Sequence, residues 1–149
     1  MVLVELFVFG GLLAPGSAPG LHRRLYRLAL ALVPTGLVLA AIAPARRVPL
    51  EHVTFIGGFS LLVYAVSLHV TLLHTGRGKL ASGSPLRIWA IALLTLAAAA
   101  VRINVERWSE QYFVLLFVAA ALWLAGALVW FAFVMPMLTT HPPDEPPAA

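Results

Sequence analysis

Four long apolar stretches constrain the fold of this 149-residue chain more than any other feature. They cover residues 25–43, 53–73, 88–101 and 112–135, and a helix that crosses a bilayer needs about 20 mostly apolar residues. Hydrophobic residues make up 61% of the chain and charged residues only 11%, a balance far from that of a water-soluble domain. The sequence therefore predicts an all-α integral membrane protein with four spanning helices.

The connections between these stretches are short and rich in turn residues, at residues 44–49, 76–85 and 104–110. Short connections favour an up-down antiparallel bundle, so residues 21–138 are expected to form one four-helix transmembrane domain. Spans two and four are expected to be adjacent and antiparallel, with Leu73 and Met135 at the same membrane face. Because the third stretch is short, Arg87 and Arg102 are expected to extend their charges out of the membrane at its two ends.

The two ends of the chain differ from this domain. Residues 1–20 are apolar but contain Glu5 and are short for a span, so we expect an interfacial, re-entrant or partly spanning segment. Residues 139–149 are rich in proline and are expected to be disordered. Six basic residues fall on one side of the membrane in the predicted topology and four on the other. Because basic residues favour the cytoplasmic side, we expect both termini to be in the cytoplasm.

Composition also excludes several kinds of chemistry and partner. The chain has no cysteine, which rules out disulfides, thiolate zinc sites and iron–sulfur clusters. No arrangement of residues typical of a hydrolase is present. The net charge of +4, on a chain with so little polar surface, favours anionic lipid headgroups as partners rather than nucleic acid.

Histidines supply the candidate site. His52, His69 and His74 lie on the second stretch or at its ends. In an up-down bundle, one membrane face gathers most of the possible ligands, while His52 is the one histidine at the opposite face. The residues expected at the first face are His22, His69, His74, Met135, Met137 and His141.

Regular helix geometry places His52 and His74 on one stripe, about 33 Å apart, so they cannot bind one metal ion. His69 lies inside the apolar zone, and Gly58 below it would let a flat macrocycle approach the helix. Neutral imidazole ligates haem iron and copper, and thioethers favour copper. Ordinary interfacial or hydrogen-bonded histidines, and methionines that only fill space, remain the alternatives.

One pair of motifs resembles the NnrS family of membrane proteins. Residues 52–58 read His-Val-Thr-Phe-Ile-Gly-Gly, and residues 74–77 read His-Thr-Gly-Arg. The similarity runs from about residue 50 to residue 143, and the chain resembles the C-terminal four-span part of that family. It implies a bacterial inner-membrane protein of the nitric oxide response, with haem b or copper and with metal at His52 and His74. Histidine at position 69, where arginine is expected in the family, is a departure.

These observations leave two main hypotheses. The first is a haem- or copper-binding membrane protein that handles nitric oxide or electrons, with His52, His69 and His74 as cofactor ligands. The second is a small structural subunit of a larger membrane complex, without a cofactor; a transporter fragment is less consistent with so few charged residues in the spans. Because a bis-histidine haem needs a second facing ligand, we also expect a homo-oligomer or other membrane subunits as partners.

Overall fold

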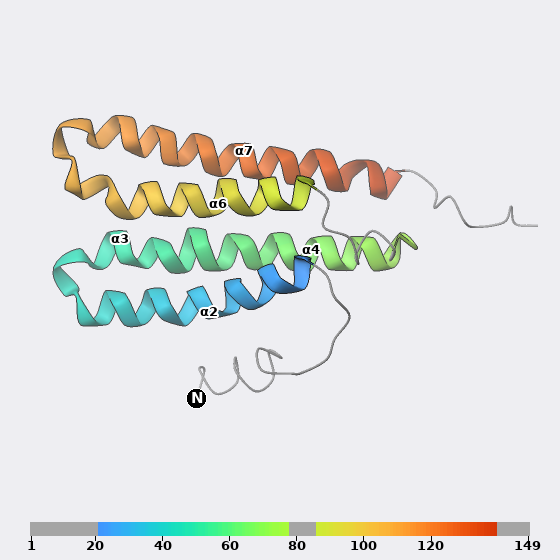
Figure 1. Ribbon diagram of the computed structural model, residues 1–149, viewed down its shortest axis with the longest axis horizontal. Helices are drawn as coiled ribbons and strands as arrows, with labels where there is room; N and C mark the ends of the chain where they lie inside the picture. Colours follow the sequence, from blue (N-terminus) through green and yellow to red (C-terminus); the bar gives the residue numbers. More distant parts are fainter. Residues whose placement is uncertain (1–20, 78–85, 140–149) are drawn as a thin grey trace, which may run out of the picture.

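The computed structural model describes residues 21–77 and 86–139 (Figure 1). This part of the chain is helical throughout apart from short turns. Span one is α2 (Leu21–Ile42). Span two is continuous through α3 (Arg47–His52), η2 (Val53–Ser60) and α4 (Leu61–His74). Spans three and four are α6 (Leu86–Asn104) and α7 (Tyr112–Thr139), and the short turns η1 (Pro44–Arg46), η3 (Val105–Arg107) and η4 (Ser109–Gln111) connect successive spans.

All four predicted spans are long and apolar enough to cross a membrane, which confirms the all-α, up-down architecture. In Figure 1, α2 and α6 run in one direction, while span two and α7 run in the other. Leu73 and Met135 therefore lie at the same end, as expected. The expectation that spans two and four are antiparallel was wrong, because helices separated by one intervening span must point the same way.

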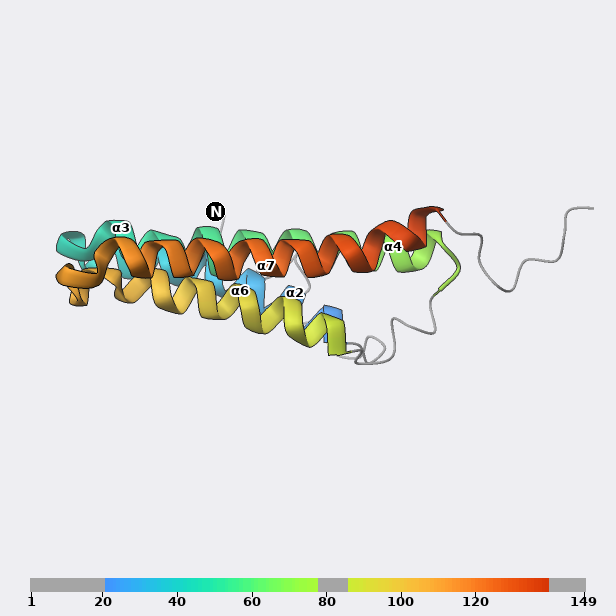
Figure 2. The same ribbon diagram turned by 90° about the horizontal axis from the view of Figure 1, so that it is seen from above.

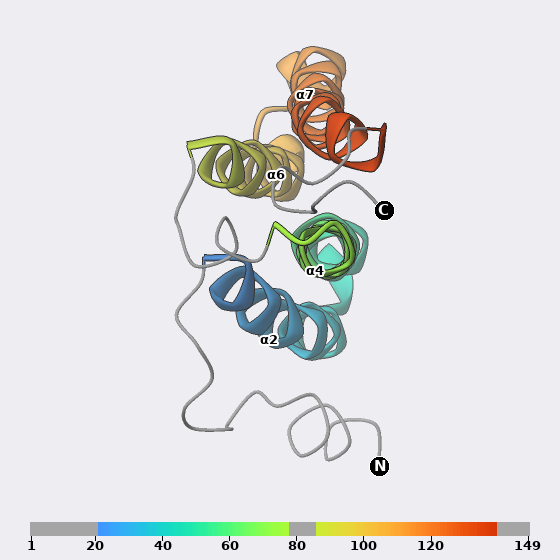
Figure 3. The same cartoon turned by 90° about the vertical axis from the view of Figure 1, so that its right-hand side faces the viewer.

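The helices form a staggered row, with α2 and α7 at its two ends (Figures 2 and 3). Only 11% of the most apolar stretch of span four is buried within the protein, whereas 44% of the corresponding stretch of span two is buried. Side chains such as Phe113, Phe117 and Phe131 consequently point outward from α7. An apolar face of this kind is suited to lipid, so this is an integral membrane protein in contact with the bilayer.

Two glycines allow spans one and two to pack closely. A Cβ added at Gly58 would lie 2.7 Å from Val33 Cγ2, and one at Gly36 would collide with Thr54. The Thr54 hydroxyl donates a hydrogen bond to the Val33 carbonyl, at 3.0 Å, across the same interface. Small residues permit this approach between membrane helices. The predicted use of Gly58 as a surface for a macrocycle was wrong, because α2 occupies that surface.

Span two is not a uniform α-helix. Residues 53–60 are π-helical, with a wider turn than the α-helical α4 that follows. The prediction that His52 and His74 share one stripe assumed 100° per residue throughout, so it does not hold. From Leu61 onward the helix is α-helical, and side-chain positions there follow regular spacing.

Several predictions lie outside the described residues. These are the apolar segment at residues 1–20 and the tail at 140–149, which includes His141. The described chain ends with Thr139, the last residue of α7. His22 is in α2, but its side chain is also outside the description.

Candidate functional site

Two matching hydrogen bonds connect spans two and four. Trp123 Nε1 donates to Ser60 Oγ, and Trp130 Nε1 donates to Ser67 Oγ, each at 3.0 Å. The residues of each pair are 63 positions apart. The two serines are seven residues apart on span two, and the two tryptophans are seven residues apart on span four. Parallel helices that repeat contacts every seven residues keep a fixed register. We call these two hydrogen bonds the Trp–Ser ladder.

Extending this register by seven residues along both helices leads to His74, which is exposed, and to Met137, which have the same separation of 63 residues. Met137 is 5% exposed and belongs to the same buried cluster as Leu68 and Leu72 of span two. Figures 1 and 3 agree that the C-terminal end of α7 comes closer to α4 than its N-terminal end does. The register therefore brings the imidazole of His74 and the thioether of Met137 to the same end of one interface.

The other two candidates on this face do not share that position. Met135 is exposed and lies two residues before Met137, about 200° around the helix. His69 is half-buried and lies about 200° from Ser67, away from the side of α4 that meets α7. The structure thus separates Met137 and His74 from Met135 and His69, which the sequence had grouped together.

The His-Thr-Gly-Arg motif ends span two. The Arg77 amide donates to the Leu72 carbonyl at 3.0 Å, and the Gly76 amide donates to the Leu73 carbonyl at 3.3 Å. Gly76 has a φ of 67°, which is the left-handed conformation that glycine favours. This is a Schellman motif, and it makes His74 the last helical residue of the span. The motif thus has a structural role in addition to any role in binding.

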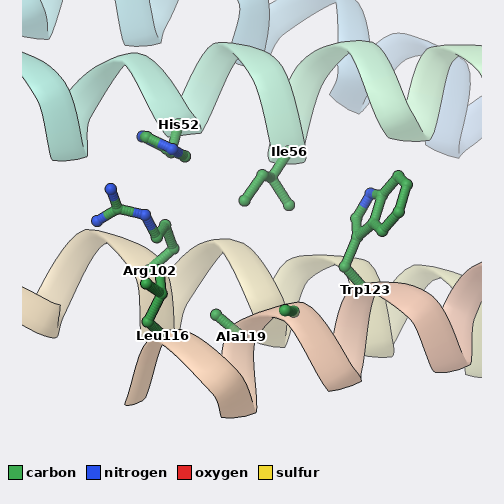
Figure 4. A pocket seen from close by; sticks show the side chains of 7 residues that line it. His52, Ile56, Arg102, Leu116, Ala119 and Trp123 are labelled. Carbon is green, nitrogen blue, oxygen red and sulfur yellow. The ribbon is translucent and has the colours of Figure 1, made fainter. Parts of the chain in front are cut away.

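His52 lies at the opposite end, where it is oriented by its own helix. Its Nδ1 is 2.7 Å from the Val48 carbonyl oxygen. Since a carbonyl can only accept, Nδ1 carries the proton, and a neutral His52 keeps the Nε2 lone pair available. His52, Ile56, Arg102, Leu116, Ala119, Ala120 and Trp123 line a cleft of about 240 Å³ beside it (Figure 4).

Arg102 is the member of this cleft that sequence reasoning assigned differently. It was expected to extend its charge out of the membrane, but its Nη1 atom is buried and has no hydrogen-bond partner within residues 21–77 and 86–139. Arg87, at the other end of α6, is exposed as predicted and lies over the ring of Phe133, 5.3 Å from its centre. The sequence feature that could have predicted this is the short third apolar stretch, because it places Arg102 close to the hydrocarbon region.

The chain was compared with models of known protein families. The model of the NnrS family, described as NnrS protein, matches residues 18–141. The chain belongs to the NnrS family. The match includes span one as well as the region from residue 50 onward that carried the resemblance. No curated protein and no solved structure matches the chain.

This NnrS chain does not bring three classical metal ligands together in its described part. Among residues 21–77 and 86–139, no three side chains of His, Cys, Asp or Glu form a group that could hold a metal ion. His52, His69 and His74 all lie on span two, with the first and last near its two ends. A metal site in this region would therefore need ligands of another type, and Met137 lies at the same end of its helix as His74 does of span two.

Proposed function

We propose that this NnrS-family protein binds copper at the end of spans two and four, with His74 and Met137 as ligands. The Trp–Ser ladder is the observation that carries the proposal, because its register aligns these two residues. Imidazole and thioether together suit copper, and thioethers favour Cu(I). Bound copper would supply one-electron redox chemistry, and the resemblance to NnrS assigns that chemistry to electron transfer in the bacterial nitric oxide response.

The residues fit copper better than haem b. Two axial ligands must approach haem iron from opposite sides, and His52, His69 and His74 belong to one helical span. The cleft at His52, of about 240 Å³, is smaller than the roughly 300–1,000 Å³ of a pocket for a drug-sized ligand. Haem would require an additional ligand from outside span two, either elsewhere in this chain or in a second copy or another subunit.

The second candidate function is that of a structural subunit in a larger membrane complex. The exposed apolar face of α7 favours it, because partner helices could cover that face as well as lipid can. Such a subunit would not need His74 or Met137 for any ligand.

Metal analysis of the detergent-purified protein tests the copper proposal. The test compares the parent with His74→Ala and Met137→Leu after loading with Cu(I), and Met137→Leu roughly conserves volume and apolarity. His52→Ala and Met135→Leu are the matched controls, since they change the same residue types away from the ladder. We expect the first two variants to lose most of the bound copper and the controls to keep it.

An equal copper content in all five proteins would contradict the proposed site and favour the structural subunit. An absorbance spectrum recorded on the same samples reports haem independently. If the parent shows a haem spectrum and His52→Ala loses it, haem at His52 would replace copper at His74 as the proposed cofactor site.

A further inference from the structure

The cleft at the opposite end of the molecule combines a partly buried cation, Arg102, with apolar walls. Arg102 lies two residues before the end of α6, and its Nη1 is shielded from solvent without a hydrogen-bond partner among the described residues. A buried donor of a charged group that lacks a hydrogen-bond partner is unfavourable, so an anionic acceptor at Nη1 would stabilise the site. Figure 4 shows Arg102 and His52 close together at one end of the cleft.

The nearest acidic residue along span two is already paired. Glu51 precedes His52, and its Oε1 is 2.6 Å from Arg47 Nε. This ion pair is on the exposed surface, with the Arg47 side chain 71% exposed. Glu51 therefore balances Arg47 and leaves the charge of Arg102 to another group.

The rest of the cleft is apolar and extends toward the middle of the bilayer. Its other walls are Ile56, Leu116, Ala119, Ala120 and Trp123. The indole N–H of Trp123 is already bonded to Ser60, so Trp123 presents only carbon to the cleft. From Leu116 to Trp123 the helix rises by roughly 10 Å, which corresponds to the first part of an acyl chain.

We propose that this cleft binds an anionic phospholipid, with the headgroup phosphate at Arg102 and part of one acyl chain along Leu116, Ala120 and Trp123. Guanidinium pairs well with phosphate oxygens, and the site lies where the third span reaches the headgroup region. The proposal is independent of the copper site, which is at the other end of span two.

Native mass spectrometry of the full chain in neutral detergent tests the lipid site. Phosphatidylglycerol and phosphatidylcholine with identical acyl chains serve as the two probes. Arg102→Gln should weaken phosphatidylglycerol binding by about ten-fold or more, as expected when a charged hydrogen bond is lost. Arg107→Gln is the matched control, because Arg107 is exposed in the next turn, and it should bind like the parent.

Thermal unfolding gives a second measurement that does not depend on lipid counting. In neutral detergent, Arg102→Gln should be at least as stable as the parent, because it removes a charged group whose Nη1 is buried without a partner among the described residues. Added phosphatidylglycerol should then raise the melting temperature of the parent and Arg107→Gln, but not of Arg102→Gln. Ala120→Phe, which fills the apolar part, should also reduce the lipid effect while Arg102 is unchanged.

Two results would overturn the proposal. One is phosphatidylglycerol binding by Arg102→Gln that equals binding by the parent. The other is stabilisation of the parent by inorganic phosphate alone to the same extent as by the lipid, which would assign the cleft to a free anion.

Discussion

The two sides of span two differ in how they meet their neighbours. On the side of span one, Gly36 and Gly58 bring the backbones together, and Thr54 bonds to a backbone carbonyl. On the side of span four, large tryptophans reach across to serines. Close backbone packing leaves no room for a ligand, whereas an interface held by long side chains leaves space at its ends. Both proposed sites, His74 with Met137 and the cleft at Arg102, lie at the ends of this second interface.

The largest expected effect tests the close packing between spans one and two. Gly36→Ala places a Cβ 2.6 Å from the Thr54 backbone nitrogen, and a backbone atom in a packed helix cannot move aside cheaply. Overpacking of this kind typically costs about 1–3 kcal/mol. We expect a clearly lower melting temperature and a lower yield of monodisperse protein.

Gly57→Ala is the matched control. Its added Cβ would come closest to the terminal Leu32 Cδ1, at 3.3 Å, and would be in ordinary contact with Ala99 Cβ at 4.0 Å; alanine also favours a helix by up to about 1 kcal/mol over glycine. A Gly57→Ala variant that is destabilised as much as Gly36→Ala would mean that close packing with span one is not specific to Gly36.

A smaller effect is expected at the end of span two that carries His74. Gly76→Ala forces a φ of 67° on a residue with a Cβ, at a cost of about 1–2 kcal/mol. The Schellman motif should then loosen, and the melting temperature should fall. Gly76→Asn should be milder, because asparagine tolerates this conformation; equal losses in both variants would argue against the left-handed turn.

The smallest expected effect concerns the Trp–Ser ladder. A double-mutant cycle with Ser67→Ala and Trp130→Phe should give a coupling energy of about 0.6 kcal/mol in the free energy of unfolding, a value typical of hydrogen bonds within membranes. Replacing Trp123 instead of Trp130 in the cycle should remove the coupling, because Trp123 bonds to Ser60. Perfect additivity for Ser67 and Trp130 would contradict the ladder.

The sequence predicted the spans well because length and hydropathy alone decide which segments enter a bilayer. It also predicted that the ends of spans two and four meet at one face, since short connections leave no other topology. It did not predict the π-helical segment at residues 53–60, which contains the close contact of Gly58 with Val33 of another span. Without that segment, helical spacing could not place His52 correctly.

The candidate site was only partly predictable, because it too depends on how distant helices pack together. His74 was singled out from its position in the His-Thr-Gly-Arg motif, but the choice between Met135 and Met137 depends on which side of α7 meets span two. That choice requires the register between two helices that are far apart in sequence. Ser60, Ser67, Trp123 and Trp130 establish the register, and their matching seven-residue spacing is visible in the sequence only after the helices are known to be neighbours.

Chemical crosslinking tests this register most directly, because the natural chain has no cysteine. The paired substitutions His74→Cys and Met137→Cys should react with a short bifunctional thiol reagent to give an intrachain crosslink, detected after proteolysis by mass spectrometry. The pair His74→Cys and Met135→Cys should crosslink poorly, since Met135 is on another side of α7. Efficient crosslinking of the Met135 pair, with none for the Met137 pair, would contradict the register and the copper site that rests on it.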